Sequence, residues 1–521
     1  MMSYLKKQPH VVVAAAASLI SIASWAVFFS LGFTTIYNDA MSHLNIARLV
    51  VDNIQPGMSQ LGSVWLPMSH VLSLPFIWND FLWHTGLAGS LVSMAAFVLS
   101  AVGIYKIIEL LSGSVRGGMV GALAFCLSLN MLYLQATPLT EPLYIVLFVF
   151  TCLYLIKYLR YQEPKALVAL GMIGAVGILT RYDAWFVAGI VGLIIIANEW
   201  FFRKQKAQVV FGNTLLYAFP IIFGVILWLG WNLLIFGDPL YSFIGPYSAR
   251  AQQAAIEATS GLITKHHLGV SSWAYLLSVA QNVGVIVLTI GTVGWLVYMV
   301  MGKYVGARVR LLAAAGMASV IVFNILALYL GFSILNLPEL NWNPSGTLAG
   351  ELFNVRYGIL ALPFAAVGVG LLVAHIKKYR TVVVGAAIAA LVGQGVLTFA
   401  AGVITVADGR IGSSAFVNDD IAQAIKNSVK PGEKVIMSTS SYNAVAFRSG
   451  LPLKEFIHEG VSRQWNGAIS QPENYGKWIV LANNDIGEPV HEALMKKQRG
   501  AFLALYEKVY TGTYASLYKL K

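Results

Sequence analysis

Apolar runs of about 20 residues recur along almost the whole chain, and this feature constrains the fold more than any other. A run of that length can cross the hydrocarbon core of a bilayer as one helix. Hydrophobic residues make up 57% of the chain and charged residues only 11%, which is typical of a polytopic helical membrane protein. We predict eleven spans, at 10–34, 86–110, 117–137, 140–159, 165–181, 183–202, 212–236, 273–301, 309–335, 356–376 and 381–405.

The connections between these segments alternate in charge. Every member of one set carries lysine or arginine, for example Lys6, Arg116 and Lys303, whereas the other set is poor in both. Basic loops favour the cytoplasmic side, so the N-terminus is predicted to be cytoplasmic and to be held by 11–33 as a signal anchor. The odd number of spans places the C-terminal region in the periplasm or the extracellular space. The net charge of +12 reflects this topology, and we predict a multi-pass plasma (inner) membrane protein without a nucleic-acid partner.

The composition changes near Ile411 to that of a soluble domain. We therefore predict a transmembrane catalytic domain over 1–410, which includes the first outer loop at 35–85, and a small exoplasmic α/β domain over 411–521. In the second domain we expect strands at 434–439 and 478–483, helices at 416–429, 444–450 and 489–498, and a strand pair within 505–518. The predicted fold class is a polytopic α-helical membrane protein of about eleven spans with a C-terminal α/β domain.

The first outer loop begins with a carboxylate where the first span should reach water. Asp39 opens an amphipathic pattern that we interpret as an interfacial helix over 40–53. Asp39 either caps this helix or takes part in chemistry, and its position alone favours neither. His43, one helical turn later, either orients Asp39 or bonds locally. The apolar segment 71–81, which contains a proline and follows Trp65 to His70, is predicted to be interfacial or re-entrant.

Polar residues also gather at the outer ends of later spans. Glu141 opens the fourth span, Arg181 and Asp183 join the fifth and sixth, and Arg356 opens the tenth. If the spans form one bundle, these residues lie at a similar depth and could converge on one outward-facing cavity. Arginines beside carboxylates suit an amphipathic substrate whose phosphate is held by arginine while a carboxylate acts as a base. Each residue also has a structural alternative: a helix cap, a snorkelling side chain or a local ion pair.

Metal and nucleotide sites have little support in the sequence. Neither zinc-type ligand spacing nor a phosphate-binding glycine loop occurs. We interpret His70, His266 and His267 as interfacial polar residues, and Cys126 and Cys152 as small packing residues. No cofactor and no metal ligand is therefore assigned, and assistance by a divalent metal stays an open alternative.

Six short motifs follow one another between residues 10 and 405. They are Tyr37-Asn38-Asp39, Trp65-Leu66-Pro67, Thr140-Glu141-Pro142-Leu143, Leu179 to Asp183, Phe236 to Leu240, and Arg356-Tyr357 with Pro363. Their order and outer placement resemble the GT-C membrane glycosyltransferases, in the branch of the protein O-mannosyltransferases and the lipid A aminoarabinose transferases. Many of those relatives carry a second acid beside the first, whereas here Asp39 lies between Asn38 and Ala40.

The resemblance implies an inverting hexosyl or pentosyl transferase that uses a polyprenyl-phosphate-linked sugar on the exoplasmic face. Asp39 would be the general base that takes the proton of the acceptor hydroxyl. Arg356, with Arg181, would bind the leaving lipid phosphate, and Glu141 and Asp183 would contact the sugar or the acceptor. The expected partners are this donor, a glycan, lipid or protein acceptor, and membrane lipids. The expected substrate-binding residues are Glu141, Arg181, Asp183, Arg356, Tyr357, His43 and His70.

Two rival functions belong to other classes. A multi-pass transporter or flippase of a lipid-linked or amphipathic substrate would use intramembrane acids to relay protons or bind ions. Against it, the polar residues gather at one side of the membrane, and no inverted repeat of broken helices is found. A non-catalytic assembly factor would be indifferent to Asp39→Asn, whereas an enzyme would lose turnover and keep its fold.

Overall fold

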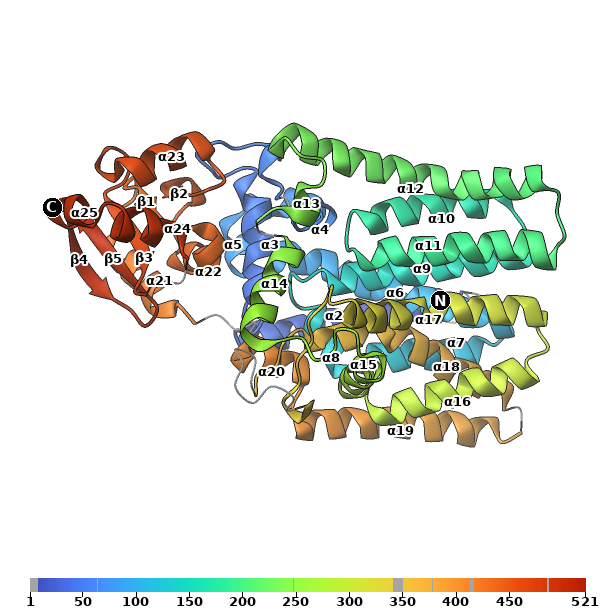
Figure 1. Cartoon of the computed structure of the whole chain (residues 1–521). Helices are drawn as coiled ribbons and strands as arrows, with labels where there is room; N and C mark the ends of the chain where they lie inside the picture. Colours follow the sequence, from blue (N-terminus) through green and yellow to red (C-terminus); the bar gives the residue numbers. More distant parts are fainter. Residues whose placement is uncertain are drawn as a thin grey trace. The chain divides into compact units, whose positions relative to one another are not determined.

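The computed structural model describes residues 8–62, 64–246, 248–340, 350–376, 378–412, 417–484 and 487–521. Contacts between residues divide the chain into two compact units, whose helices and strands are labelled in Figure 1. The membrane unit comprises residues 1–33, 63–69 and 90–414. The sheet unit comprises residues 34–62, 70–89 and 415–521.

Long apolar helices make up the membrane unit. In the described ranges, eight helical segments are long and apolar enough to cross a bilayer, which confirms the predicted polytopic class. They are α2 (Pro9–Ser30), α6 (Leu87–Ser112), α9 (Glu141–Tyr161), α11 with its π-helical end (Asp183–Phe202), α12 (Ala207–Phe236), α17 (Ala307–Tyr329), the 3-10 helix η4 with α18 (Val355–His375), and α19 with α20 (Arg380–Ile411).

Two of the predicted spans are helical but shorter than a full crossing. The segment at 117–137 contains α7 (Val115–Cys126) and then α8 (Leu129–Leu134). The break lies at Ser128, whose hydroxyl accepts from the backbone N–H of Met131 at 3.4 Å and so caps α8. The segment at 165–181 is α10 (Pro164–Ile178), which has only 15 residues.

The segment predicted as one span over 273–301 is not a single continuous helix. This segment forms two helices, α15 (Leu268–Val283) and α16 (Val285–Met301), which meet at a bend of 107°. Gly284 lies between them with φ +88°, a backbone conformation that side-chain-bearing residues rarely adopt. Gln281, Asn282 and Gly284 interrupt the apolar run at this point, but a short polar interruption does not by itself predict a bend.

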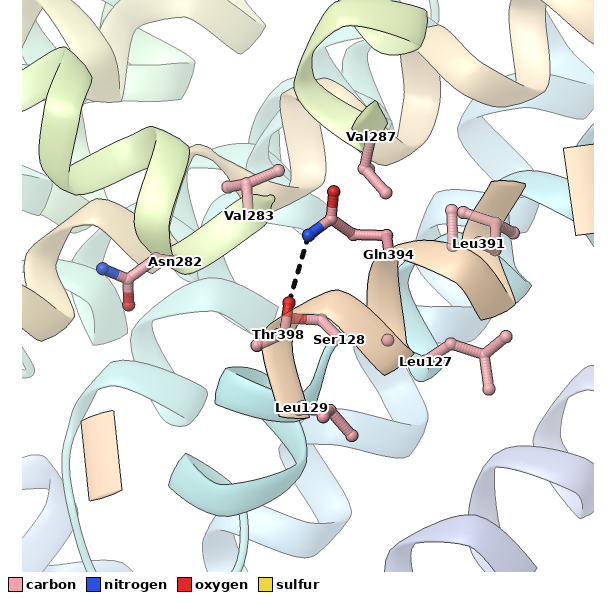
Figure 2. Close-up of a pocket in the computed structure, with 11 residues that line it drawn as sticks. Leu127, Ser128, Leu129, Asn282, Val283, Val287, Leu391, Gln394 and Thr398 are labelled. Carbon is pink, nitrogen blue, oxygen red and sulfur yellow. Dashed lines mark hydrogen bonds between the residues drawn. The ribbon is translucent and has the colours of Figure 1, made fainter. Parts of the chain in front are cut away.

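Gln394 of α19 lies at this bend (Figure 2). Its Oε1 accepts from the backbone N–H of Ile286 at 3.0 Å, and its Nε2 donates to the hydroxyl of Thr398 at 3.1 Å. The first turn of a helix has backbone donors without intrahelical partners, and such donors are costly in an apolar medium. The amide of Gln394 therefore stabilises the start of α16.

The sheet unit is built on five strands in the order β2-β1-β3-β5-β4. Strand β1 (Val435–Ile436) lies between β2 (Phe456–Ile457) and β3 (Trp478–Ala482) and pairs in parallel with both. The last two strands, β4 (Tyr506–Thr511) and β5 (Ala515–Leu520), form an antiparallel pair that joins through β5 to β3. The helices of this region are α21 (Asp419–Ser428), α22 (Thr439–Ser449), α23 (Ser462–Ser470), α24 (Pro489–His491) and α25 (Arg499–Leu505).

The predicted small α/β domain is present, with differences in detail. The strand predicted at 434–439 has two residues, because Thr439 already begins α22. Strand β2 was not predicted, because a strand of two residues leaves no alternating pattern to detect. Helix α23 was not predicted either. The helix predicted at 416–429 begins at Asp419, and residue 416 lies outside the described residues.

Much of the first outer loop belongs to the core of the sheet unit. This loop forms α3 (Asn38–Leu49), α4 (Met68–Ile77) and α5 (Asp80–His84). Met41 and Leu44 of α3 share one buried hydrophobic cluster with Ile425 and Val445. The side chain of Asn45 donates to the side-chain oxygen of Asn443 at 2.7 Å.

This grouping differs from the division by sequence, which placed residues 35–85 with the membrane helices. The physical reason is that the apolar face of an amphipathic helix can be buried by lipid or by protein, and the pattern is the same in both cases. For α3 the structure shows burial by protein. The predicted domain boundary at residue 410 stays a prediction.

Candidate functional site

Glu141 is the first residue of α9, and its side chain is 2% exposed. Thr140 occupies the N-cap position without a capping side-chain hydrogen bond, and Pro142 follows in the first turn. The carboxylate is directed to two arginines instead. Its Oε1 accepts from Nη1 of Arg181 at 3.0 Å and from Nε of Arg356 at 3.1 Å. The Glu141 carboxylate thus bridges two arginines at the start of α9.

Arg181 lies in the short connection between α10 and α11. Its Nε donates to Oδ2 of Asp183 at 3.0 Å, so the local ion pair considered from the sequence does form. The same guanidinium also reaches Glu141 and the hydroxyl of Thr140, which lies 3.2 Å from Nη1. Burial alone would lower the pKa of Arg181, but Asp183 and then Glu141 raise the pKa above its usual value.

Arg356 and Tyr357 are placed by η4, a 3-10 helix that precedes α18. The carbonyl of Val355 accepts from the hydroxyl of Ser278 at 2.8 Å and from the side-chain amide of Asn282 at 2.7 Å. Gly358 permits this close contact, because a Cβ there would lie 2.4 Å from the carbonyl oxygen of Ser278. The Arg356 side chain is 4% exposed, so it is buried rather than snorkelling.

Tyr357 lies against both guanidinium groups. Its ring centroid is 5.1 Å from the central carbon of Arg181 and 5.5 Å from that of Arg356. An aromatic ring near a guanidinium adds a cation–π attraction and restricts its orientation. The structure thus brings five predicted site residues into one group, which we call the arginine cluster: Glu141, Arg181, Asp183, Arg356 and Tyr357.

Two members of this neighbourhood were missed in the sequence. Asp408 of α20 is fully buried, and its Oδ2 lies 3.9 Å from Nη1 of Arg356. Tyr144, one turn after Glu141, is buried with its ring centroid 5.9 Å from the central carbon of Arg181. The available signal for Asp408 was an acid three residues beyond the last predicted span at 381–405. Nothing distinguished Tyr144 from the other aromatic residues of a span.

Three buried oxygens of this neighbourhood make no hydrogen bond to any residue that the structure describes. They are Oε2 of Glu141, Oδ1 of Asp183 and the hydroxyl of Tyr144. Each of these residues is at most 5% exposed. Buried polar atoms in native proteins nearly always have partners, so these atoms require an explanation.

The other predicted site residues, Asp39, His43 and His70, lie in the sheet unit. Asp39 is the second residue of α3, half-buried, with Tyr37 at the N-cap position. Nδ1 of His43 lies 2.8 Å from Nε2 of His70, which is 1% exposed. Burial and then the neighbouring His43 hold the pKa of His70 well below its usual value, so His70 is neutral near pH 7.

Among the described residues, no three His, Cys, Asp or Glu side chains lie close enough together to hold a metal ion. Cys126 and Cys152 are buried and unbonded to each other.

Comparisons with known proteins identify a matching family model and solved structures with a similar fold. Residues 82–228 match the family model described as dolichyl-phosphate-mannose-protein mannosyltransferase. The crystal structure of ArnT from Cupriavidus metallidurans bound to undecaprenyl phosphate is similar with a TM-score of 0.58 and 13% identity, over 98% of this chain and 97% of that one. A comparison with curated protein sequences gives no match.

A second similar structure is the archaeal oligosaccharyltransferase AglB from Archaeoglobus fulgidus, in complex with an inhibitory peptide and a dolichol-phosphate. Its TM-score is 0.51 at 10% identity, and the match covers 98% of this chain and 74% of that one. At sequence identities of 13% and 10%, these matches show a shared fold alone. The matched lengths show that the fold extends over both units of the present chain.

Proposed function

Because this chain has the fold of the GT-C membrane glycosyltransferases, we propose that it transfers a sugar from a polyprenyl-phosphate-linked donor to a hydroxyl acceptor. The observation that carries this proposal is the arginine cluster, in which Arg356 is buried among membrane helices and Arg181 is only 13% exposed. Buried charge in a membrane protein is costly and marks functional sites. The undecaprenyl phosphate in the similar ArnT structure and the dolichol-phosphate in that of AglB support a lipid-linked donor.

In this proposal Arg356 and Arg181 bind the phosphate of the donor. Guanidinium groups form strong charge-assisted hydrogen bonds to phosphate oxygens, and Tyr357 and Glu141 hold them in fixed orientations. As the bond between the anomeric carbon and the phosphate oxygen breaks, negative charge grows on the leaving lipid phosphate. Cations that are already oriented stabilise that charge without reorganisation.

Asp39 is the proposed general base. It takes the proton of the acceptor hydroxyl while the acceptor oxygen forms a bond to the anomeric carbon on the face opposite the leaving phosphate, so the configuration inverts. The support is the motif resemblance around Tyr37-Asn38-Asp39 and the position of Asp39 in the first turn of α3, without a capping side chain at Tyr37. A positioned carboxylate contributes about 10²- to 10⁴-fold in such a step.

The proposed location is the plasma (inner) membrane, with the N-terminus in the cytoplasm and the sheet unit outside. The charge of the alternating connections supports this orientation. The exoplasmic face is then where donor and acceptor meet. The acceptor is a glycan, a lipid or a protein, and the sheet unit either binds it or covers the site.

The test is sugar transfer by the purified protein in nanodiscs. Wild type and Asp39→Asn are incubated with a panel of radiolabelled polyprenyl-phosphate sugars and a membrane extract as the acceptor source. We expect turnover by wild type on one donor and a loss of about 10²-fold or more in the variant, with unchanged thermal unfolding. Asp80→Asn is the matched control, because Asp80 is an exposed acid of the same unit and should keep full activity.

Two outcomes would contradict the proposal. Equal turnover by wild type and Asp39→Asn would remove Asp39 as the base. No turnover and no binding of any donor would remove the glycosyltransferase assignment. Uptake of a lipid-linked substrate into vesicles that depends on an ion gradient would then favour the transporter.

A further inference from the structure

Asn130 of α8 is 1% exposed, and its side-chain amide is bonded to two other helices of the membrane unit. The Nδ2 atom donates to the backbone oxygens of Gln281 at 3.2 Å and Asn282 at 3.0 Å, in the last turn of α15. The Oδ1 atom accepts from the backbone N–H of Thr405 at 3.1 Å and from the Thr405 hydroxyl at 2.8 Å, at the start of α20 (Ile404–Ile411). One side chain therefore joins the end of one helix to the beginning of another.

These contacts satisfy backbone groups that the two helices cannot satisfy themselves. The last four carbonyls and the first four N–H groups of an α-helix have no partner within that helix. Val403, at the N-cap position of α20, makes no side-chain cap, and α15 ends at Val283 beside the bend. Asn130 thus caps the end of α15 and the start of α20 at the same time, in a membrane unit where unpaired backbone groups are costly.

Helix α15 holds the backbone that carries Arg356. Ser278 and Asn282 of α15 both donate from their side chains to the carbonyl of Val355, the residue before Arg356. Asn282 therefore binds Asn130 through its backbone oxygen and η4 through its side chain. A shift in this turn of α15 would move the Val355 carbonyl and the start of the Arg356 side chain with it.

Helix α20 approaches the same arginine through a charge. Asp408 lies three positions after Thr405, and residues at this spacing lie on one side of a helix. Its Oδ2 is 3.9 Å from Nη1 of Arg356. The two helices that Asn130 caps are therefore the ones that hold the backbone of Arg356 and place an acid beside its guanidinium.

We propose that Asn130 is a positioning residue for the donor phosphate, because it fixes Arg356 through both α15 and α20. This inference rests on the proposed function, in which Arg356 binds that phosphate, and it adds a residue that lies outside the six motifs. Orientation matters at such a site, since hydrogen bonds weaken steeply when donor and acceptor are misaligned. If Asn130 served the fold alone, its loss would lower stability without a specific effect on phosphate binding.

The experiment compares two lipids that differ only in the phosphate. Radiolabelled polyprenyl phosphate and the corresponding polyprenol are bound to the purified full chain in detergent. We expect wild type to bind polyprenyl phosphate more tightly, because only this lipid can contact the arginines. Asn130→Ala should bind polyprenyl phosphate about 10-fold more weakly, as expected for the loss of one charge-assisted hydrogen bond, and should bind polyprenol as wild type does.

Asn198→Ala is the matched control. Asn198 is a fully buried asparagine of the same unit, in the π-helical end of α11, and its amide donates to Oε1 of Glu199 at 2.6 Å. Both alanine variants should unfold at a lower temperature than wild type, whereas only Asn130→Ala should change the ratio of the two affinities. If Asn130→Ala does not fold, Thr405→Val removes one of the four contacts and should change that ratio in the same direction by a smaller factor.

A double variant tests the route through α15. Ser278→Ala removes one of the two hydrogen bonds to the Val355 carbonyl, so it should also weaken the binding of polyprenyl phosphate. If Asn130 acts through the same turn, the free-energy loss in the double variant should be smaller than the sum of the two single losses.

The inference is overturned if Asn130→Ala keeps the wild-type ratio of affinities or weakens the binding of both lipids equally. It is also overturned if the losses of Asn130→Ala and Ser278→Ala are fully additive, because the two residues would then act independently. Failure of the proposed phosphate site is distinct, since wild type itself would then bind the two lipids with the same affinity.

Discussion

Arg356 donates from Nε to Oε1 of Glu141 at 3.1 Å, although the two residues are 215 positions apart in the sequence. Both side chains are at most 4% exposed. Glu141 opens one membrane helix and Arg356 lies in the 3-10 turn before another, so this bond joins the outer ends of two spans as defined by the predicted topology. The arginine cluster is thus part of the fold as well as the proposed phosphate site.

Replacement of Glu141 by glutamine should destabilise the membrane unit strongly. The carboxylate is the shared partner of Arg181 and Arg356, and its loss leaves the buried Arg356 and the largely buried Arg181 with less compensation. Breaking a buried ion pair from one side costs roughly 3 kcal/mol or more. The unfolding temperature in detergent is measured by size-exclusion chromatography of heated samples. Glu163→Gln, which breaks an exposed pair with Lys165, should change the unfolding temperature little.

Gly358→Ala should impair donor binding by displacing the turn that carries Arg356. A Cβ at this position would lie 2.4 Å from the backbone oxygen of Ser278, a fixed atom that cannot rotate away. We expect KM for the donor to rise by about 10-fold or more, with a loss of stability of roughly 1–3 kcal/mol. Gly385→Ala is the control, because no atom lies within 4 Å of its added Cβ, and it should be neutral or slightly stabilising. Unchanged donor kinetics in Gly358→Ala would show that η4 does not position the phosphate site.

The sheet unit should lose stability as the pH falls below about 6.5, the pKa of an unperturbed histidine. Burial and then His43 keep the pKa of His70 well below that value in the folded state. The unfolded chain therefore binds a proton that the folded chain excludes, and stability present above pH 6.5 declines as the pH drops. Hydrogen exchange at α3 and α4 between pH 7.5 and 5.5 measures this.

His70→Asn should flatten that pH dependence, although not abolish it, because burial also lowers the pKa of His458 and of His84 in the same unit. The control is His267→Gln, at an exposed position of the membrane unit, which should leave the pH dependence of the sheet unit unchanged. An identical pH slope in wild type and His70→Asn would contradict the assignment of a neutral, buried His70.

A second pH effect is expected at lower pH, from Glu433. Its carboxylate accepts from Nζ of Lys477 at 2.6 Å and from the indole N–H of Trp478 at 2.7 Å, and these bonds lower the pKa to about 2. Since the unfolded pKa is about 4.3, the stabilisation is complete above that pH and is lost as the pH falls towards 2. Solvent screening limits it to about 1 kcal/mol. Urea unfolding of Glu433→Gln at pH 7 and pH 3 should show a smaller pH difference than wild type.

The local character of the chain could be predicted from its sequence. Hydrophobic runs identified the membrane class because a helix in lipid must satisfy its own backbone and present apolar side chains, whatever its neighbours. The sequence identified five site candidates, because ionisable residues at the ends of apolar runs are energetically costly unless they serve a function. They are Glu141, Arg181, Asp183, Arg356 and Tyr357. The small α/β character of the C-terminal region followed from its change in composition.

What depends on contacts between distant segments was decided only by the tertiary structure. The bend at Gly284 depends on Gln394 of another helix, which accepts from the backbone N–H of Ile286 at the start of α16. The apolar face of α3 has the same sequence pattern whether lipid or protein covers it. The structure shows that this face is buried in the core of the sheet unit. Tyr144 and Asp408 join Arg181 and Arg356 through folding alone. A sequence determines which side chains must avoid water, but only packing determines which of them meet.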